Sequence, residues 1–239
     1  MQQIIAMGGG GFSMEPENPL LDQYVIDQAN TERPRICFLP QASGEAENYI
    51  LRFYVAMREF EVKPAHLSLF SPHTKDIEDF LVSQDIIYVG GGNTRNMMVL
   101  WKEWGLDVIL HQAYEKGTIL TGLSAGAICW FEQGLTDSIP GELNPWPFLG
   151  FLEDSCCPHY DGEAERRPIY HDLIKAGSIK PGHAFDDGAA GHFVDGKLEV
   201  VVTSRPEVNG YSVSLVDGEV QETILPKTYL GKESGNSSV

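Results

Sequence analysis

The chain has 239 residues, 34 of them acidic and 17 basic, which gives a formal net charge of −17. A surface so acidic repels phosphate backbones and anionic lipids, which argues against nucleic acid and membrane surfaces as partners; a homodimer is compatible with it. The length and the 42% share of hydrophobic residues fit one α/β domain with a real core. We expect a single domain over residues 1–230 and a disordered tail over 231–239, where the sequence is small and polar.

The cysteines and the first residues of the chain indicate in which cellular compartment the protein is expected. Cys37 and Cys129 lie in apolar runs, and the adjacent Cys156 and Cys157 have neither a zinc spacing nor that of a disulfide scaffold. The first residues lack the basic region of a signal peptide, and no apolar stretch reaches the roughly 18 residues of a membrane span. We therefore expect a cytoplasmic protein.

Short apolar runs alternate with helical patterns through the first half of the chain. Strands made almost wholly of apolar residues, alternating with helices, indicate a parallel sheet that is buried on both faces. In chain order we predict strands at 3–7 and 35–39, a helix at 45–60, a strand at 65–70, a helix at 76–82, a strand at 85–89, helices at 94–104 and 106–116, and a strand at 118–121.

The pattern changes toward the C-terminus, where two hairpins are predicted. The first has an Asp195-Gly196 turn before a strand at 198–203, and the second has an Asp217-Gly218 turn between strands at 211–216 and 220–225. We expect both to extend one edge of the sheet with antiparallel strands.

The sharpest local signal is the segment G-L-S-A-G at 122–126, which matches G-x-S-x-G. A predicted strand precedes it and an apolar helical stretch at 127–131 follows it. Such a turn forces its central residue into a strained backbone conformation, and flanking glycines remove side chains that would collide there. Ser124 is then a nucleophile above the sheet, with the Ala125 N–H free to receive an oxyanion. The alternative is a small-residue turn that only packs a helix against the sheet.

A serine nucleophile needs a general base, and His159 is the strongest candidate among the seven histidines. It opens a loop after Pro158, and catalytic groups gather in loops at the ends of strands. His183 and His192 are weaker candidates, and a loop histidine without a role is the alternative.

Two aspartates are candidates for the carboxylate that orients this histidine. Asp137 follows the nucleophile helix, whereas Asp187 lies before Gly188 at the end of a predicted strand. Paired aspartates before glycine also form ordinary turns. We favour Asp187 and keep Asp137 as the alternative third member.

Two further segments offer groups that bind anions. The segment G-G-G-N-T at 90–94 follows a predicted strand, so the N–H groups of Gly91 or Gly92 are candidates for the oxyanion hole, and Asn93 for substrate binding or a helix cap. Arg166 opens a predicted helix at 166–176, and its guanidinium is suited to clamp a substrate carboxylate. The alternative for Arg166 is a solvated side chain that balances neighbouring glutamates.

Three of these segments occur in an order that resembles the peptidase E family of aspartyl dipeptidases, to which cyanophycin-degrading peptidases are related. They are G-G-G-N-T at 90–94, G-L-S-A-G-A at 122–127 and P-H-Y at 158–160. The resemblance implies a three-layer, flavodoxin-like α/β sandwich, similar to class I glutamine amidotransferases, with a mostly parallel sheet. It also implies Ser124 as nucleophile, His159 as base, and Asn93 and Arg166 as substrate-binding residues.

We therefore expect a serine peptidase that hydrolyses short peptides, as a dipeptidase favouring an N-terminal acidic residue (Asp-Xaa), without a metal or organic cofactor. Two alternatives stay open. One is an acyl hydrolase or esterase with the same catalytic residues. The other is a non-catalytic, amidotransferase-like domain that binds a small ligand.

Overall fold

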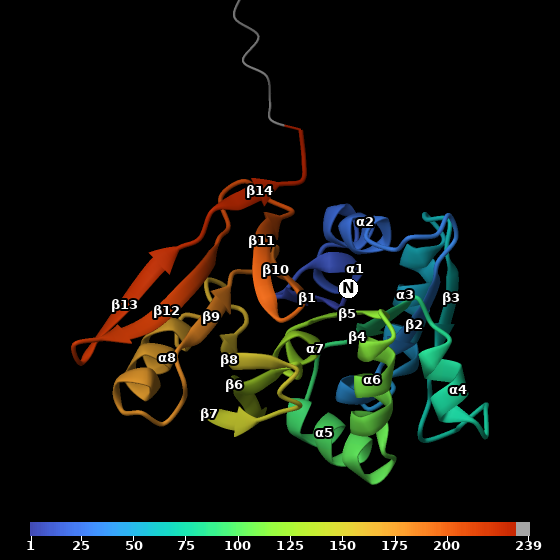
Figure 1. Cartoon of the computed structure of the whole chain (residues 1–239), viewed down its shortest axis with the longest axis horizontal. Helices are drawn as coiled ribbons and strands as arrows, with labels where there is room; N and C mark the ends of the chain where they lie inside the picture. Colours follow the sequence, from blue (N-terminus) through green and yellow to red (C-terminus); the bar gives the residue numbers. More distant parts are fainter. Residues whose placement is uncertain (233–239) are drawn as a thin grey trace, which may run out of the picture.

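The larger of two sheets forms the centre of the molecule (Figure 1). The computed structural model describes residues 1–232, so the predicted tail lies outside the described residues from 233 onward. The sheet has eight strands in the order β14-β11-β10-β1-β5-β4-β2-β3. Its strands are β1 (Gln3–Met7), β2 (Arg35–Leu39), β3 (Lys63–His66), β4 (Ile86–Val89), β5 (Ile119–Leu123), β10 (Ala189–Val194), β11 (Lys197–Thr203) and β14 (Lys227–Tyr229). The five strands from β1 to β3 in this order are parallel, which confirms the predicted α/β core.

Helices cover both faces of this sheet and complete a three-layer sandwich. Within residues 1–232 none of them is long and apolar enough to cross a membrane. They are α1 (Gly11–Met14), α2 (Leu20–Asp27), α3 (Glu47–Met57), α4 (Ile77–Val82), α5 (Thr94–Glu103), α6 (Leu106–Glu115) and α7 (Ala125–Ile128), with a 3₁₀ turn η1 (Gln41–Ser43) after β2.

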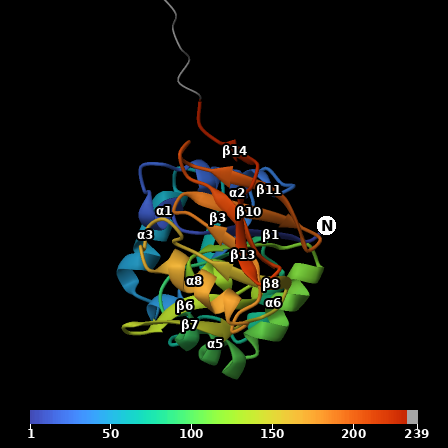
Figure 2. The ribbon, with the colours of Figure 1, turned by 90° about the vertical axis from the view of Figure 1, so that its left-hand side faces the viewer.

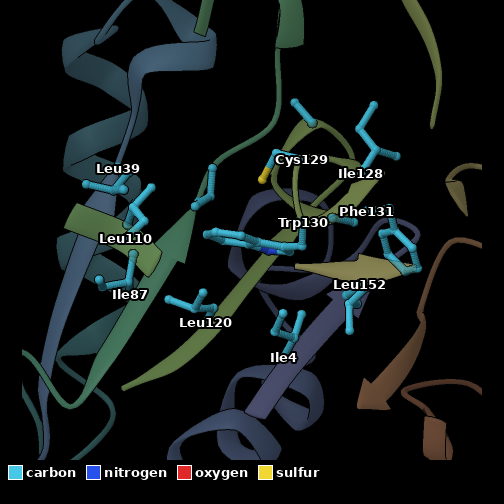
Figure 3. Packing of buried hydrophobic residues seen from close by; sticks show 14 of the residues in the cluster. Ile4, Leu39, Ile87, Leu110, Leu120, Ile128, Cys129, Trp130, Phe131 and Leu152 are labelled. Carbon is cyan, nitrogen blue, oxygen red and sulfur yellow. The ribbon is translucent and has the colours of Figure 1, made fainter. Parts of the chain in front are cut away.

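Alternation along the buried strands divides the core between the two faces. Ile4 and Ile5 are consecutive and wholly buried, yet Ile4 packs with residues of α5 and α6, whereas Ile5 packs with residues of α2 and α3. Figure 3 shows the ring of Trp130 among Ile4, Leu110 and Leu120, which come from three different elements. Trp130 thus anchors the chain just beyond α7 in the core.

A smaller sheet, to the left in Figure 1, lies beside the larger one. Its strand order is β13-β12-β9-β8-β6-β7, and α8 packs on β12 and β13, as the view from this side shows (Figure 2). The elements are β6 (Phe131–Ile139), β7 (Glu142–Pro147), β8 (Leu152–Cys157), α8 (Arg166–Lys175), β9 (Gly182–Phe185), β12 (Gly210–Val216) and β13 (Glu219–Ile224).

The smaller sheet corrects two expectations. The hairpin of β10 and β11 extends the larger sheet beside β1, as predicted, but the hairpin of β12 and β13 pairs with β9 instead. It does so because Tyr211 of β12 is buried in a separate cluster with Tyr160 and Tyr170. The helical stretch predicted at 127–131 ends at Ile128, and Phe131 already begins β6.

The third strand also lies slightly earlier than predicted, because a side chain ends it. The Glu45 carboxylate accepts a hydrogen bond from the Leu69 N–H at 2.6 Å and another from the Ser68 hydroxyl. The first of these bonds uses a backbone N–H that a longer strand could have paired with its neighbour, and β3 ends at His66.

Close packing at α7 generates a stability prediction. A methyl group at Gly126 would lie 2.2 Å from the backbone oxygen of Val89 in β4. We expect Gly126→Ala to lower the free energy of unfolding by about 3 kcal/mol, because neither backbone segment can yield without disturbing the sheet. Denaturant unfolding measures this loss. The control is Gly177→Ala, where φ is +68° and no atom lies within 4 Å; it should cost only about 1 kcal/mol. Equal losses in both variants would contradict the packing argument.

The carboxyl group of Asp22, in α2, is buried next to α1. Asp22 of α2 is 2% exposed, and its Oδ1 accepts a hydrogen bond from the Tyr88 hydroxyl at 3.1 Å. Burial raises the pKa of Asp22 from 3.8 to about 7, although hydrogen bonds from Tyr88 and the Phe12 backbone act in the opposite direction. The folded protein therefore keeps this proton at pH values where the unfolded chain has lost it.

This retained proton predicts how stability depends on pH. Between about pH 4 and 7 the unfolded chain binds fewer protons at Asp22 than the folded chain, so rising pH favours unfolding at this residue. Asp22→Asn removes that contribution. The free energy of unfolding of the wild type should therefore fall relative to that of the variant as pH rises from about 4 to 7. The change in the difference between the two is about a few kcal/mol. A difference between the two proteins that stays constant over this range in urea titrations would contradict the prediction.

Candidate functional site

The turn between β5 and α7 holds Ser124 in a strained conformation, with φ 55° and ψ −111°. The glycines beside it allow this turn, because added methyl groups at Gly122 and Gly126 would lie 2.5 Å and 2.2 Å from the Val89 oxygen. Ser124 keeps partial exposure between buried neighbours. A non-glycine residue in such a conformation persists only where the surrounding structure fixes it, and it often marks a functional site.

The end of β1 connects Ser124 to His159. The Ser124 N–H donates to the Met7 oxygen at 3.1 Å, and the His159 N–H donates to the Gly8 oxygen at 3.2 Å. Neighbouring carbonyl groups of one strand therefore fix the backbones of both residues, although they are 35 positions apart in the chain.

The imidazole of His159 is held by Asp187. Its Nδ1 lies 2.6 Å from Oδ1 of Asp187, and the two side chains are 13% and 20% exposed. His159 has a positive φ of 52°, which is uncommon for a residue other than glycine. An Nδ1 bonded to a carboxylate leaves Nε2 as the free ring nitrogen.

Two glycines and a second carboxylate position Asp187. Methyl groups at Gly9 and Gly162 would lie 2.0 Å and 2.4 Å from its carboxylate oxygens, so only glycine fits at either place. The Asp187 N–H donates to Oδ1 of Asp161 at 2.8 Å. Asp161 and Gly162 are not among the site residues predicted from the sequence, although an Asp-Gly pair directly after His159 and Tyr160 is a signal for a tight turn next to the histidine.

The other candidate carboxylate, Asp137, lies elsewhere. It belongs to β6, its side chain is 63% exposed, and its Oδ1 is 3.6 Å from Nη2 of Arg166. Arg166 is 2% exposed, and its Nε also donates to Glu163 at 2.6 Å, while Nη1 donates to the Leu135 oxygen at 3.2 Å. The guanidinium of Arg166 is thus buried and already paired with two carboxylates, rather than solvated at the surface.

The two weaker histidine candidates lie in strands, where other side chains pack against them or bond to them. His192 of β10 is bonded to the Tyr24 hydroxyl and to Gln3. His183 of β9 stacks on Phe185, and its buried Nδ1 has no hydrogen-bond partner among residues 1–232. Burial lowers the pKa of both imidazoles. Within residues 1–232 neither of them makes a hydrogen bond to Asp187, the carboxylate that holds His159.

The Gly-rich loop after β4 lies against the nucleophile. A methyl group at Gly91 would be 3.5 Å from Cβ of Ser124. The Gly91 N–H donates to the Tyr49 hydroxyl at 3.1 Å. This amide is therefore already bonded and is not free to bind an oxyanion, although the sequence had suggested that role. Gly92 has a φ of +137°, and a methyl group there would meet the Ala42 oxygen at 2.3 Å. The backbone at Gly92 therefore lies so close to η1 that a residue with a side chain would not fit there.

Asn93 has the structural role that was the alternative in its sequence interpretation. Its Oδ1 accepts from the Asn96 N–H at 2.9 Å and caps α5, while its Nδ2 donates to the Ser138 oxygen at 2.9 Å. The side chain joins the Gly-rich loop to β6, next to Asp137.

Among the described residues, 1–232, no group of three or more His, Cys, Asp or Glu side chains is arranged to hold a metal ion. The end of β1 instead anchors the backbones of Ser124, which carries a hydroxyl, and of His159, whose imidazole is held by a carboxylate; backbone amides at the start of α7 follow Ser124. Acyl transfer uses groups of these kinds.

Comparisons with known proteins agree with this architecture. The family model described as Peptidase family S51 matches residues 4–201. The chain is 56% identical, over 231 residues, to the uncharacterized peptidase YgaJ of Bacillus subtilis (strain 168), covering 97% of this chain and 100% of that protein.

Two crystal structures share the fold at low sequence identity. A peptidase from an acI-B1 Actinobacterium superposes with a TM-score of 0.66 at 16% identity, over 95% of each chain. A candidate peptidase E protein from Listeria monocytogenes EGD-e superposes with a TM-score of 0.60 at 17% identity, over 95% of this chain and 100% of that one. The two structures show the shared fold, whereas the family match over residues 4–201 and the 56% identity to a peptidase lead to one conclusion: the protein is a peptidase that belongs to family S51, the peptidase E family.

Proposed function

We propose that this peptidase is a serine hydrolase in which Ser124 attacks the carbonyl carbon of a peptide bond. The observation that carries the proposal is that a strained, partly exposed Ser124 and His159 are both anchored, through their backbone N–H groups, to the consecutive carbonyl groups of Met7 and Gly8 at the end of β1. His159 accepts the proton of the attacking hydroxyl and later donates it to the leaving amine. Water then releases the acyl group by the same route in reverse.

Asp187 is the third member of the proposed triad. Its 2.6 Å contact with Nδ1 of His159 fixes the tautomer that leaves Nε2 to act as base, and it stabilises the imidazolium that forms. Asp137 is the less suitable alternative, because its carboxylate pairs with Arg166. The N–H groups of Ala125, at the start of α7, and of Gly92 are the proposed backbone donors to the oxyanion.

The proposed substrates are short peptides, in particular dipeptides with an N-terminal acidic residue. Arg166 supports this because a buried guanidinium beside the site is a strong partner for a carboxylate. Its contact with Asp137, at 3.6 Å, is longer than its contact with Glu163, at 2.6 Å. We infer that a substrate carboxylate takes the place of the exposed Asp137, while Asn93 holds the neighbouring part of β6 through its bond to Ser138.

The triad is tested by substitution and chemical labelling. Ser124→Ala should abolish dipeptide hydrolysis and labelling by a fluorophosphonate probe. Asp187→Asn should lower kcat by about 10²-fold or more, because the amide no longer selects the required tautomer. Asp172→Asn, an exposed change of the same kind on α8, is the control that should keep wild-type turnover. Undiminished hydrolysis by the Ser124 variant, or a larger loss in Asp137→Asn than in Asp187→Asn, would refute the assignment.

Substrate preference is tested at Asp137. Removing its negative charge in Asp137→Asn leaves Arg166 with one fewer competing carboxylate. The ratio of kcat/KM for Asp-Leu to that for Ala-Leu should therefore rise about 2- to 5-fold, which corresponds to one partly exposed ion pair. The ratio is measured by amine release at pH 7 and low ionic strength. A wild-type enzyme that cleaves Lys-Leu and Ala-Leu as well as it cleaves Asp-Leu would contradict the acidic preference while leaving the serine mechanism intact.

A further inference from the structure

Tyr49 reaches the loop that faces the nucleophile, although no motif in the sequence points to it. It belongs to α3, and its hydroxyl accepts a hydrogen bond from the Gly91 N–H at 3.1 Å. Gly91 in turn lies against Ser124, since a methyl group added to it would be 3.5 Å from Cβ of Ser124. A phenolic oxygen thus occupies the position next to the amide that the sequence suggested as an oxyanion donor.

The hydrogen bonds of this hydroxyl leave its proton available. A phenol has two lone pairs that accept and one proton that it donates. The Gly91 amide donates to the oxygen at 3.1 Å, and the side chain of Ser13 is a second polar neighbour that either donates or accepts. Among residues 1–232 the Gly91 amide makes the one well-formed hydrogen bond to this hydroxyl, so the phenolic proton is not committed to a fixed acceptor.

The ring is held so that the hydroxyl cannot turn far. Tyr49 is 5% exposed, and its ring packs against Phe12 and Phe38 with centroid distances of 5.6 Å and 5.2 Å. Burial raises the pKa of Tyr49, and the hydrogen bonds with Ser13 and Gly91 offset this only in part. The phenol therefore remains protonated at neutral pH and is a fixed donor with little reorganisation to undergo.

We propose that the Tyr49 hydroxyl is a donor in the oxyanion hole, in the place that the sequence suggested for the Gly91 amide. It donates a hydrogen bond to the substrate oxygen that becomes negative when Ser124 attacks. The Gly91 N–H polarises the hydroxyl from behind and strengthens it as a donor. No covalent bond forms or breaks at Tyr49. This inference rests on the proposed serine mechanism and adds a side-chain donor to it.

The test compares two tyrosines of the same helix. Tyr49→Phe removes only the hydroxyl and should lower kcat by about 10²-fold with KM changed less than about 3-fold, as expected for a group that acts on the transition state. The affinity for a peptide aldehyde, whose hemiacetal oxygen occupies the oxyanion position, should fall in parallel. Tyr54→Phe is the matched control, because its hydroxyl bonds to His66 at 2.8 Å on the other side of the helix; both readouts should stay at wild-type values.

Several outcomes would overturn the inference. A Tyr49→Phe variant with kcat within about 3-fold of the wild type would do so. So would a fall in kcat with unchanged aldehyde affinity, which would mean that Tyr49 only positions the loop. If the variant proves unfolded in thermal melts, 3,5-difluorotyrosine at position 49 replaces it. This more acidic phenol is a stronger donor and should raise aldehyde affinity, and no change would count against the inference. A wild type without Ser124-dependent turnover is a different result, because it refutes the serine mechanism itself.

Discussion

Three consecutive residues at the end of β1 hold together the groups around Ser124. The oxygen of Met7 accepts from the N–H of Ser124, and the oxygen of Gly8 accepts from the N–H of His159. Gly9 then passes so close to Asp187 that an added methyl group would lie 2.0 Å from the carboxylate. Because β1 is buried between β10 and β5, these backbone groups are fixed by the centre of the sheet. The three residues of the proposed triad come from distant segments, yet one strand end contacts each of them.

This arrangement stores strain where the proposed chemistry needs it. Ser124 and His159 both have positive φ values, 55° and 52°, which are uncommon for residues other than glycine. Such conformations cost about 1–3 kcal/mol each and persist only when the surrounding structure compensates for them. The compensation is visible in the core behind the turn, where Trp130 is wholly buried just beyond α7. A rigid turn of this kind keeps the hydroxyl exposed and prevents it from relaxing into the helix.

Charge is arranged differently inside the molecule and on its surface. The net charge of −17 gives an acidic exterior, yet Arg166 is buried beside the site and paired with Glu163 and Asp137. A buried cation of this kind needs carboxylates in the free protein, because an unpaired charge in the interior is costly. In the proposed function these carboxylates compete with an acidic substrate. The proposed preference then depends on how readily the exposed Asp137 is displaced from Arg166.

Several features of this protein follow from the sequence by itself. Apolar strands alternating with helical patterns predict the parallel core, and the G-x-S-x-G turn with its flanking elements predicts the bend at Ser124, because both depend on neighbours close in the chain. The proline before His159 and the Asp-Gly turns of the two hairpins are local signals in the same sense. The resemblance to the peptidase E family likewise rests on short segments that are read directly from the sequence.

Other features arise only when distant segments meet in the folded chain. The separation of β12 and β13 into a second sheet depends on the burial of Tyr211 against Tyr160. The contact of Asp187, rather than Asp137, with His159 depends on the approach of Gly9, and the engagement of the Gly91 amide by Tyr49 depends on where α3 crosses the sheet. Local patterns determine which element a residue joins. The direction and partner of its side chain are set by packing between elements, and that information lies in no single stretch of the sequence.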